Sequence, residues 1–527
     1  MKLLINSFLF SIIILTVIFI FWHNPKLVSK TQDIENRLEN ALDLAGENRN
    51  ELEKVLAHYQ KDSLKFKAAS FLIENMDNCY SEQWRWRNIQ GNFVNIPFKD
   101  FRTGKELYRY MDSLQLSFQM NSRTYDARVI TANFLINNIE QAFELWKQPF
   151  ANQLEFNEFC EYILPYRVDR EGLEDFRAYL LKKYVLLFKE TEKSTTLFSA
   201  AILVNSQLLK DIRWRSSMTL YPGRFTAKTM DSLGIGDCQH LANYGIQVFR
   251  SLGIPIANDF VTAWGDTDGT HSWTVLIGEK IKIPFIACDV NPGEFSFIYK
   301  APKIFRKTFG RQHLELLSFR QPKQDVPIEL DDPFRTDVTQ EYYKTVNVSI
   351  PLFKTPPKQD NCAFLCVYNN NQWVPIDWGK INARRDSVEF KNISDSLLYC
   401  AMYYNHKQLE PVNSPFFLGT KSNIKWFGNS ANKLINCKIK WDGDRFTQTS
   451  VPLLIWNGKW EQYATYKICV LKDRKLGNGD CEYFVELKGI PENGLFRLGT
   501  YFRPFWITDG IICRSEPGRP IGLIRLR

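Results

Sequence analysis

The chain has 527 residues, too many for a single hydrophobic core, and a prior of roughly 100–200 residues for each domain predicts three or four domains. Hydrophobic residues make up 44% of the chain and charged residues 24%, which is an ordinary globular composition. The net charge of +9 is spread too thinly to form a basic stretch that binds a nucleic-acid backbone, so nucleic acid is not an expected partner. The 11 cysteines form no CxxC pair and no Cys/His cluster with zinc spacing, so we expect no metal site.

The N-terminus carries an uncharged apolar run over residues 3–22. Twenty residues at a rise of 1.5 Å span roughly 30 Å, the thickness of a hydrocarbon core, so residues 1–25 are predicted to be a transmembrane anchor or a signal segment. A signal peptide needs a small-residue cleavage site after the apolar run, but Phe21, Trp22 and His23 stand there. We therefore favour an uncleaved anchor over export after cleavage. Both interpretations predict a cell-envelope protein with extracytoplasmic domains.

Residues 28–195 show the apolar periodicity of helices. Ile34, Leu38 and Leu42 recur at helical spacing, and Gly46 ends that pattern. Residues 51–76 and 171–190 repeat it. We predict a helical domain over residues 28–195, in which helix-on-helix packing buries these stripes.

Residues 196–330 have a different pattern and are predicted to form an α+β core. A helix is expected from Cys238 to Gly253, followed by strands within residues 254–264, 271–278 and 281–290. From residue 335 onward the periodicity is mostly two, which predicts antiparallel β-sandwich-like domains. Residues 369–427 and 456–514 share an order of tryptophan-bearing hairpin, apolar strand and Pro-Phe step. We therefore predict two related β-domains, over residues 335–425 and 426–527.

Cys238 is the candidate nucleophile. It follows Gly234 and Gly236, which permit a tight turn, and the helical pattern begins at this residue. A helix N-terminus carries partial positive charge, which favours the thiolate, and its N–H groups can stabilise an oxyanion. A lone cysteine at a helix start is more often structural, so the interpretation depends on its partners.

His271 is the candidate base among six histidines. It begins the second predicted strand, whereas His240, two residues after Cys238, points elsewhere on a helix. Asp289, near the end of the next strand-like run, is the candidate third group that fixes the imidazole tautomer. Alone, such a His or Asp is usually a surface, core or turn residue. The ordered Cys-His-Asp set on a helix and two strands is a more specific signal.

The segment around these residues resembles the core of the transglutaminase-like superfamily. The residues that match its pattern are Gly236, Cys238 and Ala242, the run Leu252 to Pro255, then His271, Ser272 and Trp273, and finally Asp289 with Pro292. The resemblance covers roughly 100 residues. It implies a papain-like or transglutaminase-like α+β core inside a multidomain α+β protein. It also implies that Cys238, His271 and Asp289 form a catalytic triad.

The resemblance implies acyl transfer on a peptide or protein amide, with hydrolysis favoured over crosslinking, and no cofactor. Trp214, Trp264 and Trp273 are candidates for the walls of a substrate cleft, although core packing is the more common role of a tryptophan. The alternative from another functional class is an inactive or weakly active cell-envelope module that binds glycan or peptide through its tryptophan-rich β-domains. A third possibility is a structural scaffold, in which the triad residues would lie too far apart to hydrogen-bond.

Overall fold

The computed structural model describes residues 36–188, 196–279, 281–313, 316, 319–321, 324–428, 433–440, 449–471, 482–499, 503–508 and 511–514. The predicted anchor or signal segment at residues 1–25 lies outside this part of the chain. Within the described ranges, no helix is long and apolar enough to cross a membrane. The chain divides into two compact units: unit 1 comprises residues 1–258, 273–295 and 309–311, and unit 2 comprises residues 259–272, 296–308 and 312–527.

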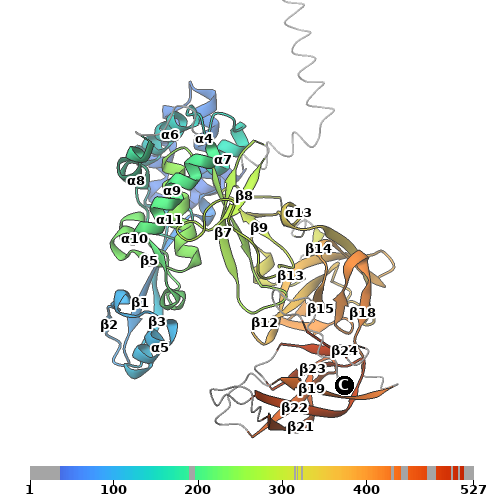
Figure 1. The fold of residues 1–527 in the computed structure, drawn as a ribbon. Helices are drawn as coiled ribbons and strands as arrows, with labels where there is room; N and C mark the ends of the chain where they lie inside the picture. The colour runs from blue at the N-terminus through green and yellow to red at the C-terminus, as the bar shows by residue number, and fades with distance from the viewer. Residues whose placement is uncertain are drawn as a thin grey trace, which may run out of the picture. The chain divides into compact units, whose positions relative to one another are not determined.

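Helices dominate unit 1, which confirms the predicted N-terminal helical region (Figure 1). Side-chain caps fix several of their starts, because Asp62, Thr131 and Thr196 accept hydrogen bonds from backbone N–H groups of the first turn. The helices from residue 49 onward that the structure describes in this unit are α3 (Arg49–His58), α4 (Ser63–Glu74), α5 (Gly104–Ser113), α6 (Ala132–Trp146), α7 (Phe156–Tyr162), α8 (Phe176–Tyr184), α9 (Leu197–Asp211), α10 (Ala227–Leu233) and α11 (Cys238–Ser251).

A three-stranded antiparallel sheet interrupts this helical region, and the helical interpretation of its residues was wrong. It consists of β1 (Tyr80–Arg87), β2 (Phe93–Val94) and β3 (Ser117–Tyr125), in the order β2-β1-β3. Trp84 and Trp86 alternate along β1, and both rings contact Phe118 on β3. Aromatic residues at a period of two favour a strand. Their ring packing across the strands therefore stabilises a sheet here, although the flanking segments have helical spacing.

The predicted core elements are confirmed. Helix α11 is followed by β6 (Ile256–Val261), β7 (His271–Ile277) and β8 (Lys282–Phe285). These strands belong to a five-stranded sheet with the order β10-β9-β6-β7-β8, which also contains β9 (Phe305–Lys307) and β10 (Arg335–Asp337). Strands β7 and β8 pair antiparallel, with Thr274 opposite Phe285 and Ile277 opposite Lys282. Pro284 is tolerated because β8 is an edge strand.

Helix α11 is the centre of the core of unit 1. Every residue from His240 to Ser251 is buried. Its apolar side chains pack with residues of α8, α9 and α10 and with Leu276, Phe285 and Ala287 of the segment that contains β7 and β8. The helix that begins at Cys238 is therefore packed on all of its sides. This packing fixes the position and the rotation of the helix.

Two antiparallel sheets form the C-terminal part of unit 2, and they share one strand order. The first runs β11-β14-β13-β12-β15-β17-β18, with β16 paired to β15, and the second runs β19-β22-β21-β20-β23-β24-β25. Each strand of the second path occupies the position of its counterpart in the first, which confirms the internal repeat and the two antiparallel β-domains of the predicted fold class.

The strands of the first sheet are β11 (Thr345–Pro351), β12 (Cys362–Asn369), β13 (Gln372–Ile381), β14 (Ser387–Ser394), β15 (Leu397–Asn405), β16 (Gln408–Pro411), β17 (Phe416–Leu418) and β18 (Ile424–Trp426). Those of the second are β19 (Leu434–Lys440), β20 (Ser450–Trp456), β21 (Trp460–Leu471), β22 (Glu482–Pro491), β23 (Leu495–Leu498), β24 (Phe505–Thr508) and β25 (Ile511–Arg514). Cys362, Cys366 and Cys469 of these sheets are free thiols.

Tryptophans join these two sheets through a shared apolar cluster. Trp373 of the first sheet and Trp456 and Trp506 of the second are buried in one cluster, with exposed fractions of 9%, 9% and 3%. The Trp373 and Trp456 rings lie 5.6 Å apart, edge to face. Among the described tryptophans of residues 335–514 none is exposed. The structure therefore gives Trp373, Trp456 and Trp506 a packing role.

Candidate active site

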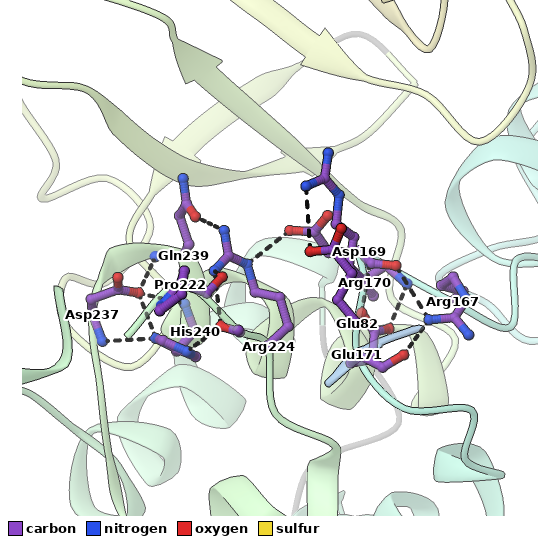
Figure 2. Close-up of polar contacts among 12 residues, drawn as sticks. Glu82, Arg167, Asp169, Arg170, Glu171, Pro222, Arg224, Asp237, Gln239 and His240 are labelled. Atoms are coloured by element: carbon purple, nitrogen blue, oxygen red, sulfur yellow. Dashed lines mark hydrogen bonds and ion pairs between the residues drawn. The ribbon is translucent and has the colours of Figure 1, made fainter. Parts of the chain in front are cut away.

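Helix α11 begins at Cys238 because the preceding residue caps it. The Asp237 carboxylate accepts hydrogen bonds from the backbone N–H groups of Gln239 at 3.0 Å and His240 at 2.9 Å. The Asp237 backbone N–H in turn donates to His240 Nδ1 at 3.4 Å, which completes a capping box, and the same ring nitrogen lies 2.7 Å from the Asp237 carboxylate oxygen. Figure 2 shows Asp237 and His240 facing each other at this end of the helix. The cap fixes the position of Cys238 as the first helical residue.

His240 is a structural residue, as its spacing from Cys238 predicted. Its side chain is buried, and its Nε2 atom lies 3.0 Å from the backbone carbonyl oxygen of Gly223. Its ring also stacks on Phe225, with 4.8 Å between the centroids. Both ring nitrogens are thus occupied by contacts that hold the helix start, which removes His240 as a general base.

Arg224 supports the first turn of α11 from the other side (Figure 2). Its guanidinium donates to the Asp169 carboxylate at 2.9 Å and contacts the Gln239 side-chain oxygen. It also donates to the carbonyl oxygens of Pro222 at 3.1 Å and Gly223 at 3.0 Å. These contacts of the Arg224 guanidinium connect the start of α11 to the loop that contains Asp169 and to the loop that contains Pro222 and Gly223. Sequence reasoning missed them, since nothing in the local pattern around Arg224 indicates so distant an acceptor as Asp169.

Asp237 precedes Cys238 in the sequence, and neighbouring groups stabilise the negative charge of its carboxylate. Burial acts to raise the pKa of Asp237, but hydrogen bonds from His240 and the charge of Arg224 hold it below its ordinary value. Asp237 is therefore ionised near neutral pH. An unshared carboxylate beside a thiol would oppose thiolate formation, so the His240 and Arg224 contacts favour the reactivity of Cys238.

Cys238 differs in exposure from most cysteines of the chain. Of the described cysteines whose exposure is known, only Cys238 and Cys469 are not buried, and Cys238 is a free thiol. Gly236, two residues earlier, lies so close to the helix that an added Cβ would be 2.7 Å from the His240 Cβ. The glycine therefore lets the chain enter the helix by a tight turn while the thiol keeps partial access to solvent.

Asp289 lies in a turn beyond the paired part of β8. Ile286 and Val290 form an isolated bridge that closes the turn, and the Asp289 N–H donates to the Ile286 carbonyl at 3.0 Å. Cys288 has a φ of 64°, a left-handed conformation that costs a non-glycine residue free energy. The sequence placed Asp289 near the end of a strand, whereas the structure places it in the following turn, because β8 ends at Phe285.

Asn205 of α9 stabilises this turn. Its side-chain oxygen accepts a hydrogen bond from the Cys288 N–H at 2.9 Å, and its amide nitrogen donates to the Val290 carbonyl and the Asn291 side chain, both at 3.1 Å. Asn205 has no exposed surface. A single buried amide thus satisfies several polar groups of the turn that contains Asp289, a role that the sequence did not reveal.

The turn also packs directly against the helix of Cys238. An added Cβ at Gly245 of α11 would lie 2.2 Å from the Ala287 Cβ, so the helix and the turn touch at this point. The Thr274 hydroxyl of β7 donates to the Phe285 carbonyl at 3.0 Å and accepts from the Ala287 N–H at 3.1 Å. Helix α11, the part of β7 from Trp273 onward and the Asp289 turn are therefore one packed assembly within unit 1.

His271 is the first residue of β7 and belongs to unit 2. Its ring is half-buried and stacks near Trp264, with 6.1 Å between the ring centroids. Burial lowers the pKa of His271, which favours the neutral imidazole near pH 7. A neutral imidazole can accept a proton, so the ring is in the form that a general base requires.

The Asp289 carboxyl lies at the surface, where the surrounding protein still removes part of its solvent and raises its pKa. Within unit 1 no described residue donates a hydrogen bond to this carboxylate. Cys238 and Asp289 belong to unit 1 and His271 to unit 2, so the Cys-His-Asp triad as a set stays a prediction.

The three tryptophans proposed for the cleft have different environments. Trp214 is 51% exposed on β4 (Arg213–Trp214), which pairs in parallel with β5 (Ile235–Gly236), just before Cys238. Trp264 is buried beside the His271 ring. Trp273 is fully buried and stacks near Phe295, so it is a core residue. Trp214 has the exposure that a cleft wall requires.

The comparisons with known proteins give little support to the assignment of this chain to a family. No family model matches the chain, and no curated protein matches it. A crystal structure of a candidate cysteine protease from Cytophaga hutchinsonii is 21% identical over 22% of this chain and 38% of its own length, with a TM-score of 0.18. A likeness at that TM-score carries no argument about fold or activity, and this chain spans well under half of that protein. Among the residues that the structure describes, no group of three His, Cys, Asp or Glu side chains forms a metal site.

Proposed function

We propose that the protein is a cysteine acyl-transfer enzyme in which Cys238 is the nucleophile, His271 the general base and Asp289 the residue that orients the imidazole. The observation that carries the proposal is the environment of Cys238. It is a partly exposed free thiol at the capped start of a buried 14-residue helix, where the helix dipole favours the thiolate. Two features support His271 as the base. Its pKa is lowered, and it is the first residue of β7, where the resemblance to the superfamily implies the catalytic histidine.

The proposed reaction begins when His271 takes the thiol proton and the Cys238 sulfur attacks an amide carbonyl carbon. The tetrahedral oxyanion needs backbone N–H donors. Since Asp237 engages the N–H groups of Gln239 and His240, we assign this role to the N–H of Cys238 itself. The C–N bond then breaks, His271 protonates the leaving amine, and a thioester remains on Cys238.

Water then attacks the thioester, with His271 as the base, and releases a carboxylic acid and the free thiol. An amine in place of water would give crosslinking. We favour water, so the proposed activity is that of a peptidase or amidase. We further propose that the substrate is a peptide or protein outside the cytoplasm and that the N-terminal segment attaches the enzyme to the membrane. The apolar run at residues 3–22 is the basis of that location.

The test is alkylation of the native protein by iodoacetamide between about pH 5 and 9, with the modified cysteines identified by mass spectrometry. Cys469 is an internal control, because it is also partly exposed. We expect Cys238 to react at about pH 6–7, below the ordinary thiol pKa of about 8.5, and its reactivity to fall in the His271→Ala variant. Cys469 should be unaffected by that substitution.

A matched control is His58→Ala, which removes an exposed histidine of α3. This variant should leave the pH profile of Cys238 unchanged. The proposal is wrong if Cys238 and Cys469 share one pH profile, or if His271→Ala and His58→Ala behave alike, because either result would show that no imidazole assists the Cys238 thiol.

A further inference from the structure

A cavity of about 560 Å³ lies within unit 2, away from the residues of the proposed triad in sequence. Its lining includes residues of β9, β10, β13 and β14. A volume of this size is typical of sites for small molecules. The walls carry both charges and two aromatic rings, from Lys303, Arg335, Asp337, Glu389, Phe305 and Trp378.

One buried cation of this cavity has all of its partners within the protein. The Lys303 ammonium, whose side chain is 4% exposed, lies 2.6 Å from the Asp337 carboxylate and 3.2 Å from that of Asp377. It also donates to the Lys391 carbonyl at 2.8 Å. An ammonium has three N–H donors, so this set satisfies it. Lys303 and the two aspartates are therefore a closed structural group.

Arg335 is the second buried cation of the cavity, and unlike Lys303 it has no hydrogen-bonded partner among the described residues. It is 7% exposed and lies on β10 in the same cavity wall, with its guanidinium carbon 4.2 Å from the centre of the Phe305 ring. No described residue offers its nitrogen atoms a hydrogen-bond acceptor or an ion-pair partner. Asp332, Asp337 and Asp377 stabilise its charge only through space.

A largely buried guanidinium without a protein acceptor leaves its N–H donors to whatever occupies the cavity, which is either water or a ligand. The guanidinium carbon lies over the Phe305 ring, and a guanidinium that packs its face on an aromatic ring keeps the donors of its edge available. That edge is the fork that binds a carboxylate or a phosphate in a bidentate manner. The arrangement resembles a prepared anion site more than a structural ion pair.

We propose that this cavity binds a small hydroxylated monocarboxylate, whose carboxylate pairs with Arg335. A phosphate dianion suits the cavity less well, because Lys303, Arg335, Lys380 and Lys391 against Asp337, Asp377 and Glu389 leave a net charge of about +1 (4 − 3), which a single carboxylate balances. The Glu389 carboxylate, which lies outside the Lys303 group, can accept hydrogen bonds from hydroxyl groups of the ligand. The half-buried Trp378 adds an apolar surface on which a sugar-like ring can rest.

The experiment is a thermal denaturation of the whole protein with D-glucuronate and D-gluconate, followed by calorimetric titration with the tighter of the two. D-glucose supplies hydroxyl groups without a carboxylate, acetate supplies a carboxylate without hydroxyl groups, and inorganic phosphate supplies the rival oxyanion. We expect at least one of the sugar acids to raise Tm by a few degrees and to bind more tightly than glucose, acetate or phosphate.

Three variants test the role of Arg335. Arg335→Lys keeps the charge but loses the fork, and we expect its affinity to fall at least tenfold. Arg335→Leu should lose the response while its own Tm equals or exceeds that of the wild type, because it removes a buried guanidinium that has no hydrogen-bonded partner in the protein. Arg384→Leu, which changes an exposed arginine of the turn between β13 and β14, should respond as the wild type does.

The proposal is overturned if neither sugar acid changes Tm, if phosphate binds more tightly than both, or if Arg335→Leu responds like the wild type. It is also overturned if Arg335→Leu has a Tm several degrees below that of the wild type, because the guanidinium would then belong to the structure. None of these outcomes depends on the reactivity of Cys238, so this site and the proposed acyl-transfer function stand or fall separately.

Discussion

The contact between Gly245 and Ala287 offers a sharp test of how the candidate site is built. Gly245→Ala would place two Cβ atoms 2.2 Å apart, whereas ordinary carbon contacts are about 3.5–4.0 Å. The helix and the Asp289 turn must then separate by more than about 1 Å. Overpacking of this kind costs about 1–3 kcal/mol, and alanine regains about 1 kcal/mol over glycine in a helix. We expect a net destabilisation of about 0–2 kcal/mol.

We expect Gly245→Ala to affect the reactivity of Cys238 more strongly than it affects the stability of the fold. If the Asp289 turn orients His271, a displacement of about 1 Å can cost up to a hundredfold in a catalytic step. The assay is the rate of Cys238 alkylation near pH 7, measured beside a urea denaturation curve. We expect the Gly245→Ala variant to alkylate Cys238 several-fold more slowly while it remains folded.

Ala287→Gly in the Gly245→Ala background is the decisive control, because it removes the atom that clashes. The next atom near the added Cβ is the Ala287 Cα at 3.7 Å, an ordinary contact. The double variant should therefore recover both stability and Cys238 reactivity, with a favourable coupling of about 1–3 kcal/mol. Additive effects, or a Gly245→Ala variant identical to the wild type, would refute the direct packing of helix and turn.

Further predictions concern the surroundings of the site. Asn205→Ala should destabilise the protein by about 1–3 kcal/mol, because it leaves buried groups of the Asp289 turn without partners, and Ser206→Ala on the same helix should not. Because burial lowers the pKa of His271 in the folded state, the unfolded state binds protons first, so stability should fall as pH drops below about 6.5. The His271→Asn variant should show a smaller loss between about pH 7 and 5, and an equal loss would contradict the burial of this ring. Trp214→Ala should change stability by less than about 0.5 kcal/mol, whereas Trp273→Ala should cost about 3–5 kcal/mol; similar denaturation midpoints would contradict their different burial.

Local patterns in the sequence were sufficient to predict the main elements of the fold. The glycines before Cys238 and the apolar helical pattern after it predicted α11, and short apolar runs predicted β6, β7 and β8. The repeated order of hairpin, strand and Pro-Phe step predicted two related β-domains, which have the same strand order. Such features are encoded by near neighbours in the chain, through propensity, capping and periodicity, so one sequence can reveal them.

The same local reasoning failed where distant residues decide the outcome. Trp84 and Trp86 form a strand because Phe118 packs across from them, and Asp289 stands in a turn because Asn205 satisfies the turn's polar groups. The unsatisfied edge of Arg335 is also a tertiary property. A sequence shows that an arginine is present, but only the folded arrangement determines which acceptors reach its nitrogen atoms and which positions lose their water.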